Sequence, residues 1–95
     1  MALYITITGQ KHYFGMLPFS IDTVLSLQPE PENLHDPKAI AVYSPVYGKA
    51  GYVARTVETM ADGTISAGTL LSILDSPEKA VIRFIAGDYI IAEIL

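Results

Sequence analysis

The chain has 95 residues, of which 51% are hydrophobic, and its formal net charge at pH 7 is −4. This length and composition predict one domain, residues 1–95, with a true hydrophobic core, and they argue against disorder. The absence of cysteine excludes a disulfide scaffold, a thiol nucleophile and a thiolate metal site. The acidic balance argues against a broad basic face for nucleic acid.

The sequence carries no targeting or membrane signal. Its first residues lack the basic segment and long apolar segment of a signal peptide, and no apolar run approaches the length of a membrane span. We therefore expect a cytoplasmic protein that does not associate with membranes.

The first third of the chain predicts two strands joined by an apolar connection. Residues 2–8 and residues 23–27 alternate between apolar and polar or small side chains, which is typical of half-buried strands. Between them, residues 11–19 form a second apolar piece. Its internal glycine, Gly15, suggests a β-bulge or the close approach of another backbone.

The middle of the chain predicts a loop followed by a β-hairpin. Residues 28–38 contain three prolines and therefore form no regular structure. Strands follow at residues 39–44 and 50–54, separated by a turn at residues 45–48. The loop holds most of the side chains that could take part in chemistry: Glu32, Asn33, His35, Asp36 and Lys38.

The last part of the chain predicts one helix and three strands. Residues 56–62 have a cap, a helical apolar spacing and an Asp-Gly stop, so they predict a short helix. Residues 69–74, 79–85 and 89–95 predict strands, the last two joined by a tight turn. Many short strands with frequent turns favour a small barrel or a sandwich.

Two segments of the chain resemble the HIRAN domain family. Residues 9–15, GQKHYFG, are similar to its glycine–aromatic–glycine segment, and the stretch from the proline-rich loop to the second hairpin strand follows its order and spacing. In that stretch the matching residues are Glu30, Pro31, Asn33, Asp36, Ala39, Ile40, Val42, Gly51, Tyr52 and Val53. The resemblance implies an all-β fold: a small OB-like β-barrel with one or two short helices.

The resemblance also implies a pocket for a single-stranded DNA 3′ end. It places Lys11 at a basic position, His12 and Tyr13 at aromatic positions, and His35 at a further stacking position. Asp36 would accept a hydrogen bond from the terminal 3′-hydroxyl and would repel a terminal phosphate. A base stacked on such a ring gains about 1–3 kcal/mol.

Further along, the resemblance places Tyr52 and a phosphate-contacting residue, Arg55, near the same pocket. Lys38 and Lys49 are weaker candidates for contacts to the nucleic-acid backbone. DNA-binding members carry tyrosine where this chain has His12 and His35. Stacking would then be done by imidazole, whose charge changes near pH 6.5, or else this pocket takes another ligand.

Each candidate also has a purely structural interpretation. Tyr13, Phe14 and Tyr52 could be core residues, while Lys11 and Arg55 could be solvated surface charges. Asn33 and Asp36 are good turn residues because their side chains bond to nearby backbone amides.

The residues therefore favour a binding module over an enzyme. No metal-ligand spacing, nucleophile motif or glycine-rich phosphate loop is present, so we expect no cofactor and no catalysis. The leading prediction is recognition of single-stranded DNA, at a free 3′-hydroxyl, in DNA repair or processing, with a helicase or nuclease acting in trans. The alternative is a protein-interaction module that keeps the barrel, with the apolar last strand offering an edge to a homodimer.

Overall fold

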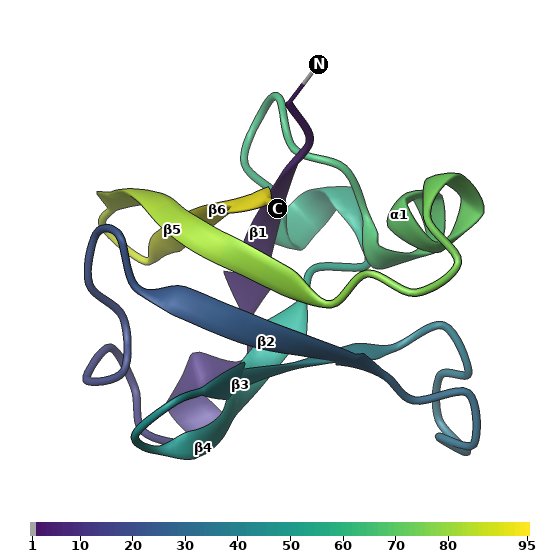
Figure 1. Cartoon of the computed structure of the whole chain (residues 1–95), viewed down its shortest axis with the longest axis horizontal. Helices are drawn as coiled ribbons and strands as arrows, with labels where there is room; N and C mark the ends of the chain where they lie inside the picture. The colour runs from purple at the N-terminus through teal and green to yellow at the C-terminus, as the bar shows by residue number, and fades with distance from the viewer. Residues whose placement is uncertain (1) are drawn as a thin grey trace.

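A computed structural model describes residues 2–95 as a closed, six-stranded antiparallel β-barrel (Figure 1). Neighbouring strands follow the order β1-β4-β3-β2-β5-β6 around the barrel. The strands are β1 (Tyr4–Thr8), β2 (Val24–Pro29), β3 (Ile40–Ser44), β4 (Gly48–Val53), β5 (Lys79–Ala86) and β6 (Tyr89–Ile94). The connections hold the single-turn 3₁₀ helices η1 (Gln10–His12) and η2 (Val57–Thr59) and the helix α1 (Ala67–Ile73). The predicted all-β barrel with short helices is confirmed.

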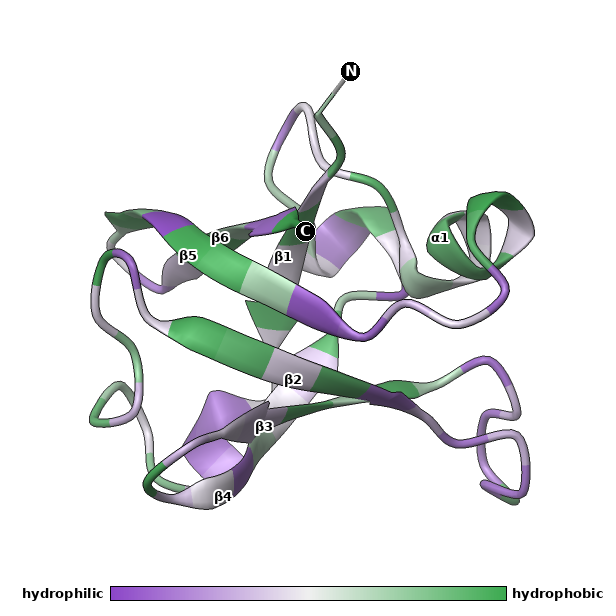
Figure 2. Ribbon diagram, viewed as in Figure 1, coloured by the Kyte–Doolittle hydropathy of each residue, from purple (hydrophilic) through white to green (hydrophobic). Residues whose placement is uncertain are grey.

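The apolar side chains that point inward from the strands fill the inside of the barrel. On β2, Leu25 and Leu27 are buried while Val24 and Ser26 are exposed, as the two-residue period requires. Figure 2 shows hydrophobic residues along β2 and β5 and mainly hydrophilic residues in the loop between β2 and β3. The large side chains of the core are Ile5, Ile7, Phe19, Leu25, Leu27, Ile40, Val42, Val53, Leu70, Ile82 and Ile90.

The seam between β1 and β4 closes the barrel, and it requires a glycine. The two strands pair Ile7 with Val53 and Thr8 with Tyr52. A Cβ atom on Gly51 would lie 2.7 Å from the carbonyl oxygen of Thr8 and 3.2 Å from Cγ2 of Ile7. Because the first of these atoms belongs to the backbone, no side-chain rotation relieves the contact, so only glycine fits this position.

The segment 11–19, which the sequence predicts only as an apolar piece, begins in a 3₁₀ helix and continues as turns. Gly9 adopts a left-handed conformation and turns the chain directly into η1, after which residues 13–18 form turns. Gly15 also has a positive φ of 61°, and nothing lies within 4 Å of its ideal Cβ position. Gly15 is therefore needed for a turn and not for the bulge or close approach that we predicted.

The predicted helix at residues 56–62 is also wrong, because the helix lies further along the chain, where a strand was predicted. Residues 56–62 form only η2, and Val57 is exposed there. The helix is α1, which overlaps the stretch 69–74 predicted as a strand. The hydroxyl of Ser66 caps it by accepting the backbone N–H of Thr69. Ala67 and Leu70 face the core at helical spacing. A short apolar run such as TLLSIL does not by itself distinguish the two structures.

The last strand has no free edge, contrary to our prediction. β6 pairs with β1 on one side and with β5 on the other, so its backbone N–H and C=O groups are hydrogen-bonded to neighbouring strands of the barrel (Figure 1). A dimer formed by pairing at this strand would require the barrel to open. Within residues 2–95, no helix is long and apolar enough to cross a membrane.

We expect Gly51→Ala to lower the free energy of unfolding by about 1–3 kcal/mol, because the added methyl group forces β4 away from β1. Urea denaturation monitored by circular dichroism measures this change. Ser26→Ala, on the exposed face of β2, is the control and should change stability by no more than about 0.5 kcal/mol. An unchanged urea midpoint for Gly51→Ala would contradict the closure argument.

Candidate functional site

Four of the predicted site residues line one hollow, which lies between the end of β4 and the loop that joins β2 to β3. We call this hollow of about 400 Å³ the loop hollow. Its polar lining comes from the end of β1, the loop, β4 and the segment after β4: Thr8, Asn33, His35, Asp36, Tyr52, Arg55, Thr56 and Thr59. Four of the seven predicted site residues, His35, Asp36, Tyr52 and Arg55, therefore meet in one place.

Asn33 shapes the loop that carries His35 and Asp36. Its side-chain oxygen accepts the backbone N–H groups of His35 and Asp36 at 2.9 and 3.1 Å. Its side-chain nitrogen donates to a carboxylate oxygen of Glu30 at 3.0 Å. The prediction that Asn33 braces the turn is thus confirmed, and the bracing leaves the ring of His35 exposed at the hollow.

Asp36 and Arg55 form an ion pair inside the loop hollow. Nε of Arg55 donates to Oδ2 of Asp36 at 2.6 Å, and the backbone N–H of Lys38 donates to Oδ1 at 3.0 Å. Asp36 therefore braces the turn and also lines the hollow. A carboxylate offers about four lone-pair positions, so this group keeps capacity for a further donor.

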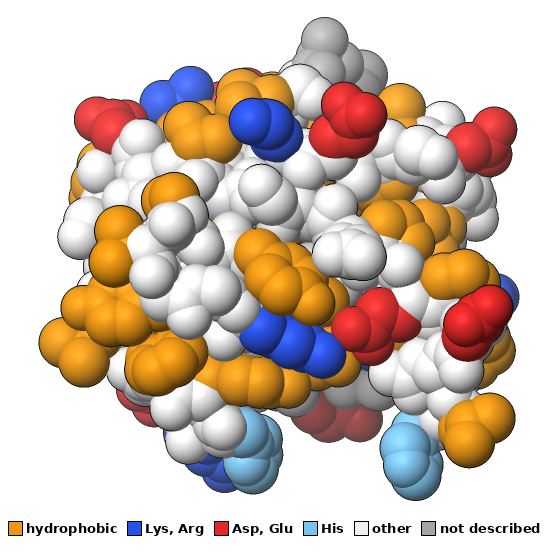
Figure 3. All heavy atoms as spheres, turned by 60° about the horizontal axis from the view of Figure 1, so that its bottom comes forward, with side chains coloured by type: hydrophobic (Ala, Val, Ile, Leu, Met, Phe, Trp, Pro, Cys, Tyr) orange, Lys and Arg blue, Asp and Glu red, His pale blue; other side chains and the backbone are white. Residues whose placement is uncertain are grey.

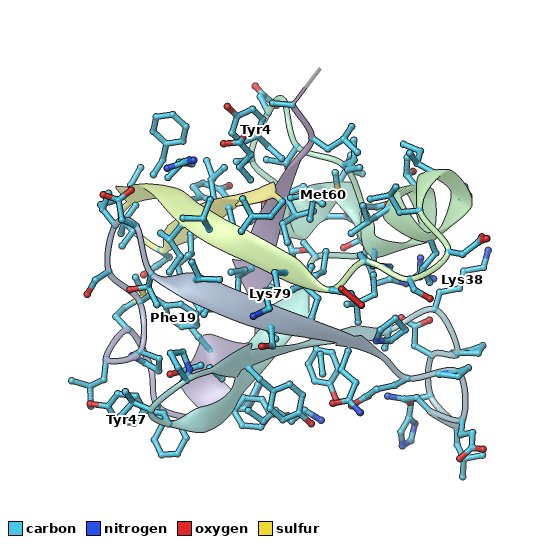
Figure 4. The ribbon with its side chains drawn as sticks, viewed as in Figure 1. Tyr4, Phe19, Lys38, Tyr47, Met60 and Lys79 are labelled. Carbon is cyan, nitrogen blue, oxygen red and sulfur yellow. The ribbon has the colours of Figure 1, made fainter. Side chains whose placement is uncertain are left out.

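Helix α1 holds Arg55 from the other side. A Cβ atom on Gly68 would lie 2.7 Å from Nη1 of Arg55, so the guanidinium rests where a larger residue would have its side chain. The side chain of Lys38 also passes near Gly68, and Figure 4 shows Lys38 beside α1. This contact places the Arg55 guanidinium next to Asp36.

A second polar cluster joins the loop to the β3–β4 hairpin. One carboxylate, that of Glu30, accepts the Lys49 ammonium and the Tyr52 hydroxyl, each at 3.0 Å, in addition to Asn33. Lys49 also donates to the Tyr52 hydroxyl and lies 4.6 Å from the centre of the Tyr52 ring. Tyr52 is therefore fixed by polar contacts at the rim of the hollow and is not a core residue.

These contacts shift the acid–base properties of the cluster. Burial raises the pKa of Glu30, but the hydrogen bonds from Asn33, Lys49 and Tyr52 outweigh it, so the pKa lies below the ordinary 4.5. The hydrogen bond to Tyr52 raises the pKa of Lys49, and the Glu30 carboxylate raises it further, despite the opposing effect of desolvation. Lys49 therefore stays charged and Glu30 ionised at neutral pH.

The three remaining predicted residues lie on η1 and the turn after it. Lys11 lines a second hollow of about 660 Å³, the turn hollow, which shares Thr8 and Thr59 with the loop hollow. His12 is exposed and lines neither hollow. The ring of Tyr13 is 38% exposed and lies 6.5 Å from the ring of Tyr52, so it is not part of the core.

Figure 3 shows this side of the molecule. Both histidines project from it at separate places, and the densest group of hydrophobic side chains lies on the left of this view. His12 and His35 therefore do not form one stacking pocket. Within the described range 2–95, no three His, Asp or Glu side chains stand close enough to hold a metal ion.

Two solved structures share this fold. A protein from Lactobacillus plantarum superposes with a TM-score of 0.68 at 19% sequence identity, covering 98% of this chain and 90% of that one. The HIRAN domain of human HLTF superposes with a TM-score of 0.65 at 22% identity, covering 98% and 74%. No protein-family model matches the sequence, and no curated protein matches it significantly. At these identities the likeness is one of fold, and it confirms the HIRAN-type barrel.

We expect Glu30→Gln to lower the free energy of unfolding by about 1–2 kcal/mol at neutral pH, because the charged hydrogen bonds to Lys49 and Tyr52 weaken. The loss of stability stays small because the side chains of Glu30 and Lys49 are 24% and 29% exposed, so water screens their charges. Glu32→Gln, at an exposed position of the same loop, is the matched control.

The same pair of proteins gives a pH test. The folded-state pKa of Glu30 lies below 4.5, so its stabilising effect is complete above that pH and is lost as the pH falls through the folded-state value. The difference in stability between wild type and Glu30→Gln should therefore shrink in urea titrations as the pH falls from about 6 to about 3. A difference that stays constant over this range would show that the Glu30 charge contributes nothing.

Proposed function

We propose that the chain is a non-catalytic module that binds single-stranded DNA and recognises a free 3′-hydroxyl end, in DNA repair or processing. The observation that carries the proposal is the loop hollow, where an oriented carboxylate, a guanidinium and an exposed imidazole ring surround one space. The HIRAN-type barrel and the sequence resemblance support the same ligand class.

Asp36 is the group that would distinguish a free end from a blocked one. Arg55 and the backbone N–H of Lys38 hold its carboxylate in place, so it needs little reordering to accept a hydroxyl. A terminal phosphate would bring negative charge against the same carboxylate and would be repelled. This discrimination follows from one oriented acidic group.

The neighbouring groups would hold the last nucleotides. His35 is exposed beside Asp36 and offers a ring face to a base. Arg55 uses Nε for Asp36, which leaves its terminal nitrogens for a phosphate. Lys11, in the adjoining turn hollow, would contact a phosphate further from the end. A helicase or nuclease that acts on the bound end would be a separate protein.

The alternative, a protein-interaction module, now depends on a different observation. The closed barrel offers no edge at β6, but apolar side chains after η1, among them Phe14, Met16 and Leu17, are exposed. An interaction module would bind no oligonucleotide, and its self-association would depend on protein concentration and little on salt.

Fluorescence anisotropy with two short oligonucleotides tests the proposal. One carries a free 3′-hydroxyl and the other a 3′-phosphate. We expect the wild type to bind the free end at least about 10-fold more tightly, because a hydrogen bond to a charged acceptor and the avoided repulsion together exceed about 1.4 kcal/mol. Equal binding of the two ends, or binding of neither, would contradict end recognition.

Asp36→Asn separates charge from loop structure. The amide oxygen of asparagine can still accept the backbone N–H of Lys38, so the turn is kept while the repulsive charge is lost. We expect the preference for the free end to fall to about 3-fold or less, within the weaker range of neutral hydrogen bonds. Asp75→Asn, exposed away from both hollows, is the control and should keep the wild-type preference.

The salt dependence of binding provides an independent measurement. Three or four basic groups can reach the strand, so the slope of log affinity against log salt concentration should be about −2 to −3. A much steeper slope would show a broad electrostatic surface instead of a small site.

A further inference from the structure

A row of aromatic side chains leads away from the loop hollow along the outside of the β3–β4 hairpin. The row begins at Tyr52, whose ring centre lies 6.5 Å from that of Tyr13. Phe14 follows Tyr13 in the chain, and its ring centre lies 5.2 Å from that of Tyr47. In Figure 4, ring side chains lie along the lower edge of the barrel between the labelled Tyr47 and Lys38.

The rings of this row are accessible, although none of them contributes to the core. Tyr13, Phe14 and Tyr47 are 38%, 44% and 39% exposed. Exposing the apolar surface of a ring to water is unfavourable, and burying it against a partner removes that cost. A group of exposed rings therefore marks an interaction site. Two ring pairs in sequence, each tilted and partly open, match the way in which single strands are held by stacking platforms.

The charges along the row also indicate how it would bind. Lys49 lies over the rings of Tyr52 and Tyr13, at 4.6 and 5.9 Å, but its charge is paired with Glu30. A surface with a neutralised cation attracts phosphates weakly. Its contribution would come from ring faces, which accept any base.

The length of the row fits a short run of nucleotides. Tyr47 lies in the turn before β4 and Tyr52 lies five residues further on β4, so the row spans at most about 16 Å along the chain. Stacked nucleotides are spaced about 3.4 Å apart along one strand, so about four or five bases can follow this distance.

We propose that Tyr13, Phe14 and Tyr47 form a stacking track for the bases that precede the 3′ end of a bound single strand. This inference rests on the proposed function, since the end itself would occupy the loop hollow. The track supplies affinity without base specificity, while Asp36 and its neighbours select the end.

The test compares oligonucleotides of three and eight nucleotides, both with a free 3′-hydroxyl, in competition anisotropy. The shorter one fills the loop hollow, and the longer one also reaches the track. We expect the wild type to bind the longer one at least about 5-fold more tightly, because one stacked base contributes about 1–3 kcal/mol, which is about 5- to 150-fold in affinity. An eight-nucleotide strand without bases at its five 5′ positions keeps its phosphates and should bind like the shorter one.

The double variant Phe14→Leu/Tyr47→Leu removes the ring faces but keeps apolar side chains. It should bind the three-nucleotide strand as the wild type does and lose the advantage of the longer strand. Phe84→Leu is the matched control, because Phe84 is an exposed ring on β5 that pairs with Tyr4 and lies outside the row. Circular dichroism melts confirm that each variant is folded.

Each outcome decides between the two proposals. If the wild type binds both strands equally, or if the double variant keeps the full advantage of the longer strand, the track is overturned and end recognition stands. If neither strand binds the wild type, both proposals are overturned.

Discussion

The carboxylate of Glu30 holds together the face of the barrel that carries the candidate site, because three hydrogen bonds converge on it. It accepts hydrogen bonds from Asn33 in its own loop and from Lys49 and Tyr52 on the hairpin. Asn33 in turn fixes the backbone of His35 and Asp36. A proline-rich loop with exposed side chains is therefore connected to the barrel wall through one charged group, because three donors from two elements converge on it.

The two ends of this network serve different purposes. At one end, Arg55 donates to Asp36 in the loop hollow, and its guanidinium packs against Gly68 of α1. At the other end, Lys49 is neutralised by Glu30 and covers two tyrosine rings. In the proposed function, an acidic protein would in this way offer a small site with local charge beside a surface of exposed rings, without a broad basic patch.

The strands were predictable from the sequence because their side chains alternate over a single buried face, as in β2. The position of α1 was not, because a single hydroxyl, that of Ser66, selects helix for a short apolar run that also reads as strand. The prediction of a free edge at β6 was wrong because closure of the barrel depends on which strands become neighbours. Gly51 permits that closure by packing against Thr8, which is far away in the chain.

The candidate site was predictable in part for similar reasons. The family resemblance singled out His35 and Asp36 in one polar loop, Tyr52 on the second hairpin strand and Arg55 just after it. The role of Glu30 could not be found, since its partner Lys49 is 19 residues away and meets it only in the folded barrel. His12 was assigned by its place in a motif, and the structure places it on η1, outside the lining of the loop hollow.

Chemical-shift mapping by heteronuclear NMR would test most directly the central claim that the Glu30-supported loop and the end of β4 form the binding site. An isotopically labelled protein would be titrated with a short single strand that carries a free 3′-hydroxyl. The account predicts that the largest shifts fall on the backbone amides of residues 33–36 and 52–56, with smaller shifts along residues 13–14 and 47. Shifts centred on α1 or on the β5–β6 hairpin, or no shifts at all, would contradict it.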